Sequence, residues 1–295
     1  MEALFQEIES LARTEREADM RQYTTFKIGG KAALMAFPKC TADVLRMLAL
    51  CKNVPHAVIG NGSNLLVGDA GFRGVIIRIG SEMGEIRTEG NRIFAGAGAS
   101  LAAVSRAAME AGLSGMAPLA GIPGTVGGAV MMNAGAYGGE MRDVVEEVTY
   151  ILDGNVEKSR EHGFSYRHSR YMDMGAIVTE VVFSLSVGDK EEIRAEMEAL
   201  AQKRREKQPL NLPSAGSAFK RPKDGYAAEM IDKAGLRGFS VGGAAVSEKH
   251  AGFVVNQGGA TAKDVKTLLE KVQETVFEKY GVKLEPEIRF LGDFT

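Results

Sequence analysis

Hydrophobic residues at helical spacing mark both ends of the chain. Near the beginning, residues 1 to about 20 predict a helix, because Leu4, Ile8 and Leu11 recur at helical spacing. Near the end, Thr261 is placed to cap the most regular amphipathic helix of the sequence. The apolar face of that helix is predicted to carry Val265, Leu268, Leu269, Val272, Val276 and Phe277.

Short apolar runs bounded by glycine or proline predict strands in the first third of the chain. They cover residues 33–37, 57–60 and 74–79. A helix capped by Thr41 is expected between the first two, with an apolar stripe from Val44 to Cys51. This order of strand, helix and strands predicts a small α+β lobe.

A hairpin, a helix and two longer strands are predicted next. The hairpin pairs residues 85–88 with residues 92–95 through a Glu-Gly-Asn turn. Ser100 is expected to cap the helix that follows. The longer strands are predicted over residues 144–152 and 177–185, which makes this a second lobe.

A strongly charged helix over residues 189–207 is expected to connect the second lobe to a third region. That region is predicted to hold a short helix over 226–234, strands within 242–255 and a final strand over 284–291. The fold class is therefore α+β.

The predicted domains are residues 1–80, 81–206 and 207–295, with the last strand able to pack back on the first two domains. A chain of 295 residues is long enough for two or three domains.

Composition argues against several classes of protein. The chain is 45% hydrophobic and 25% charged with a formal net charge of -2, which gives no electrostatic reason to expect nucleic acid or an anionic membrane. The N-terminus lacks the pattern of a signal peptide, and no apolar run approaches the roughly 20 residues that span a bilayer. Cys40 and Cys51 are predicted to be core thiols in a reducing compartment, and the four histidines lack metal-ligand spacing. We expect a cytoplasmic protein without a metal.

Residues 60–65, which read GNGSNL, form the first candidate site. The two glycines can turn several backbone N–H groups toward one point, and such a nest binds anions. The segment is not the Rossmann fingerprint, because Leu65 stands where its third glycine would be. An ordinary tight turn between strands is the alternative interpretation.

Residues 115–139 contain too few bulky side chains to build a core of their own. Such glycine density lets the backbone approach a flat, extended ligand closely. The alternative is close packing of helix and strand that only glycine permits. Together with residues 60–65, this segment suggests a dinucleotide bound between two lobes, without saying which dinucleotide.

Five separated motifs resemble those of the UDP-N-acetylenolpyruvoylglucosamine reductase family, in the same order. They are GNGSNLLV, AGIPGTVGGAVMMNAGAYGGE, FSYRHSRY, SAGSAFKRP and LEPEIRF. The N-terminal YTTFKIGGKA is also similar, so the resemblance runs from about residue 20 to the C-terminus. Only a few residues separate Tyr171 from Ile177, so the chain resembles the shorter class that lacks the inserted tyrosine-bearing loop.

The resemblance implies a two-lobed FAD-binding fold of the vanillyl-alcohol oxidase type plus a C-terminal α+β substrate-binding domain. It implies a flavoprotein oxidoreductase, with non-covalent FAD and with NADPH as hydride donor. The implied substrate is UDP-N-acetylglucosamine enolpyruvate and the product is UDP-N-acetylmuramate. This reaction serves peptidoglycan synthesis, and thereby cell wall biogenesis, cell shape and cell division. A monomer is favoured.

Three residues match the chemical positions of the family. Ser217 matches its proton donor, Arg167 the arginine that faces the enolpyruvyl carboxylate, and Glu287 a carboxylate that orients or polarises the enolate. Hydride addition places negative charge beside the carboxylate, so a fixed cation and a proton donor are the groups the reaction needs. Without the resemblance, these three residues read as a loop serine, a surface arginine and the solvated face of a strand. Arg170 and Glu285 are the neighbouring residues that compete for the same roles.

The resemblance also implies binding residues. The cofactor positions are Gly60, Asn61, Gly62, Ser63, Asn64, Leu65, Gly121, Thr125, Gly127, Gly128, Asn133 and Gly135. The substrate positions are Arg204, Lys207, Asn256 and Tyr166. For the two basic residues, a solvated helix end is the alternative.

Two other functions stay open on the residues alone. One is a different flavin oxidase on the same fold, and the other is a non-catalytic UDP-sugar binding protein. The joint presence of Ser217, Arg167 and Glu287 favours the reductase, because neither alternative needs all three.

Overall fold

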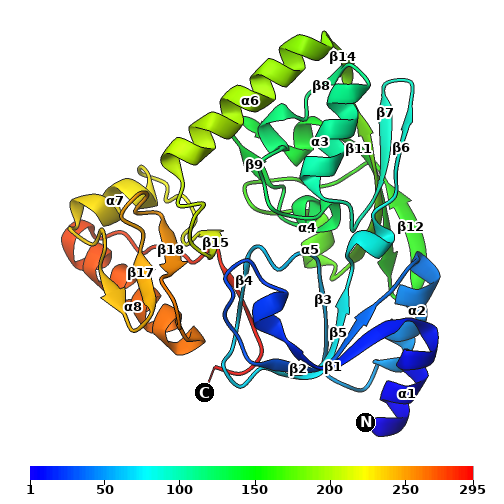
Figure 1. Ribbon diagram of the computed structural model, residues 1–295, viewed down its shortest axis with the longest axis horizontal. Helices are drawn as coiled ribbons and strands as arrows, with labels where there is room; N and C mark the ends of the chain where they lie inside the picture. Colours follow the sequence, from blue (N-terminus) through cyan, green and yellow to red (C-terminus); the bar gives the residue numbers. More distant parts are fainter. Residues whose placement is uncertain (295) are drawn as a thin grey trace. The chain divides into compact units, whose positions relative to one another are not determined.

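A computed structural model describes residues 1–294, and its contacts divide the chain into two compact units (Figure 1). Unit 1 comprises residues 1–15, 34–61 and 75–204. Unit 2 comprises residues 16–33, 62–74 and those from 205 onwards. Most of the two predicted N-terminal lobes falls in unit 1. A separation between those lobes at residue 80 stays a prediction.

The N-terminal segment is half helix and half strand. Helix α1 spans Glu2–Leu11 and strand β1 spans Arg13–Asp19, so the prediction of one helix to about residue 20 is wrong in its second half. The helically spaced apolar residues end at Leu11, and β1 instead hydrogen-bonds to β2, Lys31–Phe37. Tertiary strand pairing outweighs local helix preference here.

A four-stranded sheet has the order β1-β2-β5-β3, and β3 (His56–Ile59) runs parallel to β5 (Phe72–Arg78). Helix α2 spans Thr41–Leu50 and contacts α1. Its N-cap is Cys40, so the prediction of a Thr41 cap is wrong by one residue.

A five-stranded antiparallel sheet forms the centre of unit 1, with the order β12-β11-β13-β7-β6. Its strands are β6 (Ile86–Glu89), β7 (Arg92–Gly96), β11 (Val145–Leu152), β12 (Asn155–Ser159) and β13 (Ile177–Ser184). The predicted hairpin of β6 and β7 is confirmed, as are the two longer strands.

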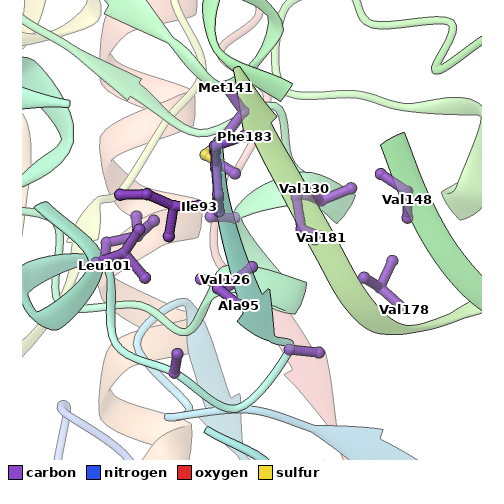
Figure 2. Packing of buried hydrophobic residues seen from close by; sticks show 14 of the residues in the cluster. Ile93, Ala95, Leu101, Val126, Val130, Met141, Val148, Val178, Val181 and Phe183 are labelled. Atoms are coloured by element: carbon purple, nitrogen blue, oxygen red, sulfur yellow. The ribbon is translucent and has the colours of Figure 1, made fainter. Parts of the chain in front are cut away.

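Helices α3 (Leu101–Glu110) and α4 (Val126–Met131) pack on this sheet. Ser100 caps α3 as predicted, because its side chain accepts a hydrogen bond from the N–H of Ala103. Figure 2 shows Val126 and Val130 of α4 among Ala95 and Val181 of the sheet. Burial of these side chains fixes α4 against β7 and β13.

The remaining elements of unit 1 are short, apart from the connecting helix. They are η2 (Ser81–Met83), β8 (Leu113–Ser114), η3 (Ala117–Leu119), β9 (Gly135–Ala136), β10 (Gly139–Glu140), η4 (Met141–Asp143), α5 (Arg170–Asp173) and β14 (Ser186–Val187). The predicted charged helix is α6, Lys190–Lys207, and it crosses the boundary between the units.

Unit 2 is built on a sheet of order β15-β18-β17-β16. Its strands and helices are β15 (Ser214–Ser217), α7 (Ala227–Lys233), β16 (Ser240–Val241), β17 (Ala244–Val246), β18 (Phe253–Asn256) and α8 (Ala262–Tyr280). A parallel pair of β4 (Leu65–Val67) and β19 (Arg289–Leu291) and the short η1 (Met20–Gln22) complete it. Helix α8 contacts β16, β17 and α7 (Figure 1).

Two predictions about unit 2 are corrected. Thr261 caps α8 as predicted, but Phe277 is 57% exposed and lies off the buried face. The final strand begins only at Arg289, because Pro286 interrupts regular pairing and the segment before it lies beside residues 218–220. Ile288 is buried, whereas Phe290 is 44% exposed. Among the described residues, no helix is long and apolar enough to cross a membrane.

Candidate active site

A cavity of about 100 Å³ lies beside α4 in unit 1. Four of its lining residues are predicted FAD positions: Gly60, Thr125, Gly127 and Gly128. The others are small or aliphatic, namely Val58, Ile59, Ile79, Ala97, Met131, Ala176, Ile177 and Val178. Sequence reasoning did not name this second group as cofactor residues; most of them lie at or beside the ends of strands, and Met131 is the last residue of α4. Glycine and aliphatic walls suit the flat surface of a ring system.

The glycines of this cavity are also required by close packing. A Cβ on Gly60 would lie 2.3 Å from the Oγ1 of Thr125, which is itself buried. A Cβ on Gly127 would lie 2.9 Å from the Cβ of Ala97. Close packing, the alternative interpretation of residues 115–139, therefore applies at Gly127, and the same packing forms a wall of the cavity. Binding of a ligand by these glycines stays a prediction.

Replacing Gly60 by alanine is expected to lower both FAD content and stability. Overpacking of this kind costs about 1–3 kcal/mol, and a loss of that size in cofactor affinity corresponds to about a 5- to 150-fold higher dissociation constant. FAD titration and thermal unfolding measure the two effects. For the unfolding temperature alone, the control is Gly128→Ala, whose Cβ would lie 3.5 Å from the same Oγ1 and whose helical backbone favours alanine. Equal unfolding temperatures for the two variants would contradict the packing argument.

The first N–H groups of α4 do not face a ligand. Those of Val126 and Gly127 donate to the carbonyls of Ala99 and Ala97, each at 2.8 Å. A phosphate therefore has to find its donors elsewhere.

Residues 60–65 supply such donors. Within residues 1–294, no hydrogen bond engages the backbone N–H groups of Asn61, Gly62, Ser63 and Asn64. The side chain of Asn61 donates to the carbonyl of Pro123 at 3.4 Å, and that of Asn64 to the carbonyl of Glu287 at 3.0 Å. The loop is held by its side chains, which leaves its N–H groups available to phosphate oxygens.

Gly121 and Gly135 also lie in tight packing. The guanidinium of Arg204 donates to the carbonyl of Gly121, and a Cβ on Gly121 would lie 2.9 Å from its Nε. A Cβ on Gly135 would lie 2.7 Å from the Cγ of Glu140. Arg204, a predicted diphosphate partner, thus lies against a predicted cofactor position within unit 1.

Arg167 lies in a tight turn of unit 1. Ser165 and His168 exchange backbone hydrogen bonds of 3.0 and 3.2 Å across it. Arg167 has a φ of +55°, and its guanidinium carbon lies 5.3 Å from the ring of the exposed Tyr166. A left-handed non-glycine residue is strained and is found where the surroundings impose it, often at functional sites. The competing Arg170 donates to the carbonyl of Glu161 at 3.2 Å.

A buried pair supports the base of this turn. His162 Nδ1 lies 2.7 Å from the hydroxyl of Tyr171, and its Nε2 lies 3.3 Å from the carbonyl of Glu146. Burial lowers the pKa of His162 from its ordinary 6.5, and the charge of Arg170 lowers it further. Burial raises the pKa of Tyr171 to about 12.

His162 is expected to make the fold sensitive to acid. Above pH 6.5 the imidazole is neutral in both the folded and the unfolded chain, so it contributes no pH dependence. Below pH 6.5 the unfolded chain binds a proton that the folded chain resists, so stability falls until the lowered pKa is passed, by at most about 1.4 kcal/mol per pH unit. Urea unfolding between pH 7.5 and 5 should show a smaller slope for His162→Gln. The exposed His56→Gln is the control, and equal slopes for the two would contradict the assignment.

Unit 2 brings Ser217 and Glu287 together across 70 residues of sequence. The N–H of Glu287 donates to the carbonyl of Ala218 at 2.9 Å, and Phe219 bridges to Pro286. The competing Glu285 forms an ion pair with Lys220 and is 69% exposed at its side chain. Sequence reasoning alone could not pair these two segments.

A β-bulge precedes Ser217. Ser214 pairs with Val255 and Ser217 with Phe253, so three residue steps on β15 match two on β18. Gly216 in the bulge has a φ of +80°. Bulges redirect side chains and are common beside active sites. Among the described residues, no hydrogen bond engages the Ser217 hydroxyl, so it is available to a ligand.

Lys207 and Asn256 have different surroundings in unit 2. Burial lowers the pKa of His250, and the charges of Arg237 and Lys207 add to this lowering, so Lys207 lies within electrostatic range of that imidazole. The buried Asn256 donates to the carbonyls of Phe26 and Lys27 and accepts from the N–H groups of residues 258 and 260. Its side chain holds three segments of unit 2 together and has no polar atom unbonded.

A cavity of about 530 Å³ in unit 2 lies elsewhere. Its wall includes Arg205, Asn211, Glu248 and Lys249, but none of the predicted substrate residues. We assign it no role in the reaction.

Comparison with known proteins identifies two matching family models. Residues 32–158 match an FAD binding domain, and residues 208–291 match the C-terminal domain of UDP-N-acetylenolpyruvoylglucosamine reductase. A reductase of that name from Agathobacter rectalis is 50% identical over 95% of this chain and 94% of its own length. One from Caldicellulosiruptor bescii is 47% identical over 95% of this chain and 91% of its own.

The chain belongs to the UDP-N-acetylenolpyruvoylglucosamine reductase family.

Structures agree with this assignment. The family member from Thermus caldophilus superposes with a TM-score of 0.82 at 38% identity, over 95% of this chain and 98% of its own. An alkyldihydroxyacetonephosphate synthase superposes with a TM-score of 0.50 at 16% identity over 63% of this chain, which concerns the fold alone. These findings confirm the FAD-binding fold of the vanillyl-alcohol oxidase type and the reductase-type C-terminal domain. They also confirm that the protein is an FAD-dependent oxidoreductase.

Proposed function

We propose that the chain reduces UDP-N-acetylglucosamine enolpyruvate to UDP-N-acetylmuramate with NADPH and FAD. This reaction is a reductive step of peptidoglycan synthesis. The observation that carries the proposal is the backbone pairing of residues 218–219 with 286–287, which makes the segment that carries Ser217 a neighbour of the segment that carries Glu287. The glycine-walled cavity and the open N–H groups of residues 61–64 support FAD as the cofactor. FAD, when bound, supplies the transfer of hydride between the nicotinamide and the enolpyruvyl double bond.

Each proposed catalytic residue has one task. Arg167 binds the enolpyruvyl carboxylate with two parallel hydrogen bonds and so offsets the charge that develops beside it. Ser217 gives its hydroxyl proton to the substrate carbon that becomes basic. Glu287 orients the enolate. Tyr166 and Lys207 contribute to binding of the UDP-sugar, and Arg204 to the position of residue 121.

The proposal also covers the location of the enzyme and its oligomeric state. We place the enzyme in the cytoplasm, because a nucleotide sugar and NADPH are its proposed reactants. We also favour a monomer.

An anaerobic visible spectrum tests the proposal. NADPH should bleach the flavin band of the purified protein, and adding the enolpyruvyl UDP-sugar should restore the band. Bleaching without restoration would reject this substrate while keeping the oxidoreductase. Rapid restoration by oxygen, with no response to the sugar, would favour a flavin oxidase instead.

A further inference from the structure

The turn that carries Arg167 is tied at both ends to residues 131–133, which comprise the last residue of α4 and the two residues after it. At one end, the side-chain N–H₂ of Asn133 donates to the carbonyl of Ser165 at 3.0 Å. At the other end, the Oγ of the fully buried Ser169 donates to the carbonyl of Met131 at 2.9 Å. Met131 lines the cavity beside α4, so one short segment touches both the cavity and the turn.

Each polar atom of the Asn133 side chain is already hydrogen-bonded to the protein. Besides Ser165, its N–H₂ group donates to the carboxylate of Glu140 at 2.7 Å, and its oxygen accepts from the N–H of Arg142 at 3.0 Å. Asn133 is 1% exposed and has a φ of +41°, a strained conformation in which asparagine is tolerated better than most residues. Buried, fully satisfied polar groups of this kind fix a local geometry.

We propose that Asn133 and Ser169 are positioning residues, which hold the Tyr166–Arg167 turn in a fixed place relative to α4 and thereby set how well Arg167 binds the substrate carboxylate. This assignment differs from the expectation that Asn133 is a cofactor-binding residue. It rests on the proposed function, in which Arg167 binds that carboxylate.

Asn133→Gly is the decisive variant, because glycine accepts the left-handed backbone and only the side chain is lost. We expect its FAD content and its rate of bleaching by NADPH to stay within about threefold of the parent, whereas the KM for the enolpyruvyl UDP-sugar rises about 10- to 100-fold, the effect of losing buried hydrogen bonds. Ser169→Ala should act in the same direction. Asn91→Gly is the matched control, because Asn91 also donates to a backbone carbonyl in unit 1, that of Leu185 at 3.2 Å, but does not touch the turn.

A double-mutant cycle tests whether Asn133 acts through Arg167. In an Arg167→Gly background, Asn133→Gly should raise the KM by less than about threefold, because residues that act through one another are not additive. Full additivity would overturn the proposal, as would an equal loss in bleaching by NADPH, because either result would mean that Asn133 acts on the fold or the cofactor.

Hydrogen exchange gives a readout that does not depend on activity. In the holoenzyme without substrate, peptides covering residues 162–171 should exchange faster in Asn133→Gly than in the parent or in Asn91→Gly, and unchanged exchange would overturn the proposal. If the parent itself fails to respond to the enolpyruvyl sugar, the proposed function fails, and faster exchange would still establish that Asn133 holds the turn.

Discussion

Replacing Ser217 by alanine is expected to slow reoxidation of the flavin by the enolpyruvyl UDP-sugar by about 10²- to 10⁴-fold, the usual contribution of a positioned general acid. Bleaching by NADPH should be unchanged, because that half-reaction needs no proton on the substrate carbon. Substrate binding should also change little, because a single uncharged hydroxyl is removed. The measurement is a pair of stopped-flow experiments, one for each half-reaction.

Ser214→Ala is the matched control for this prediction. Ser214 lies at the other end of β15, before the bulge, and its carbonyl rather than its side chain accepts a hydrogen bond from Thr25. The control should react like the parent. If Ser217→Ala slowed both half-reactions equally, Ser217 would be important for binding or folding and the proton would have to come from another group.

Much of the fold could be predicted because local signals and tertiary packing agree. The β6–β7 hairpin has its turn sequence, and α3 and α8 have capping residues at their first turns. The first predicted helix failed in its second half because β1 pairs with β2, a contact that no local pattern encodes. The last strand begins later than predicted, because residues 285–287 lie against residues 218–220 and only residues 289–291 pair with β4.

The sequence motifs predicted which segments form the candidate site, but not which partners their side chains contact. Gly60, Gly127 and Gly128 line one cavity as a group of cofactor residues should. The pattern could not reveal that each polar side-chain atom of Asn133, which lies inside a motif, and of Asn256 is bonded to the protein itself. A polar residue within a motif can serve the ligand or the loop that holds the ligand, and only the bonding partners distinguish these roles.

Arg167→Gly is expected to leave the fold intact and to lower kcat/KM for the enolpyruvyl UDP-sugar by about 10²- to 10³-fold, the effect of removing one preorganised group that offsets developing charge. Glycine suits the φ of +55° at this position, so the unfolding temperature should stay the same or rise. Loss of activity without loss of stability would therefore come from the missing guanidinium.

Arg167→Lys separates charge from geometry. Lysine keeps the positive charge but not the planar pair of donors, so its activity should lie between those of the parent and Arg167→Gly. Arg170→Lys is the control. Arg170 is the other candidate for the carboxylate-binding arginine on sequence grounds, but its guanidinium donates to the carbonyl of Glu161. If Arg170→Lys lost substrate affinity while Arg167→Lys did not, the carboxylate-binding arginine would be Arg170, and the left-handed conformation of residue 167 would serve only the shape of the turn.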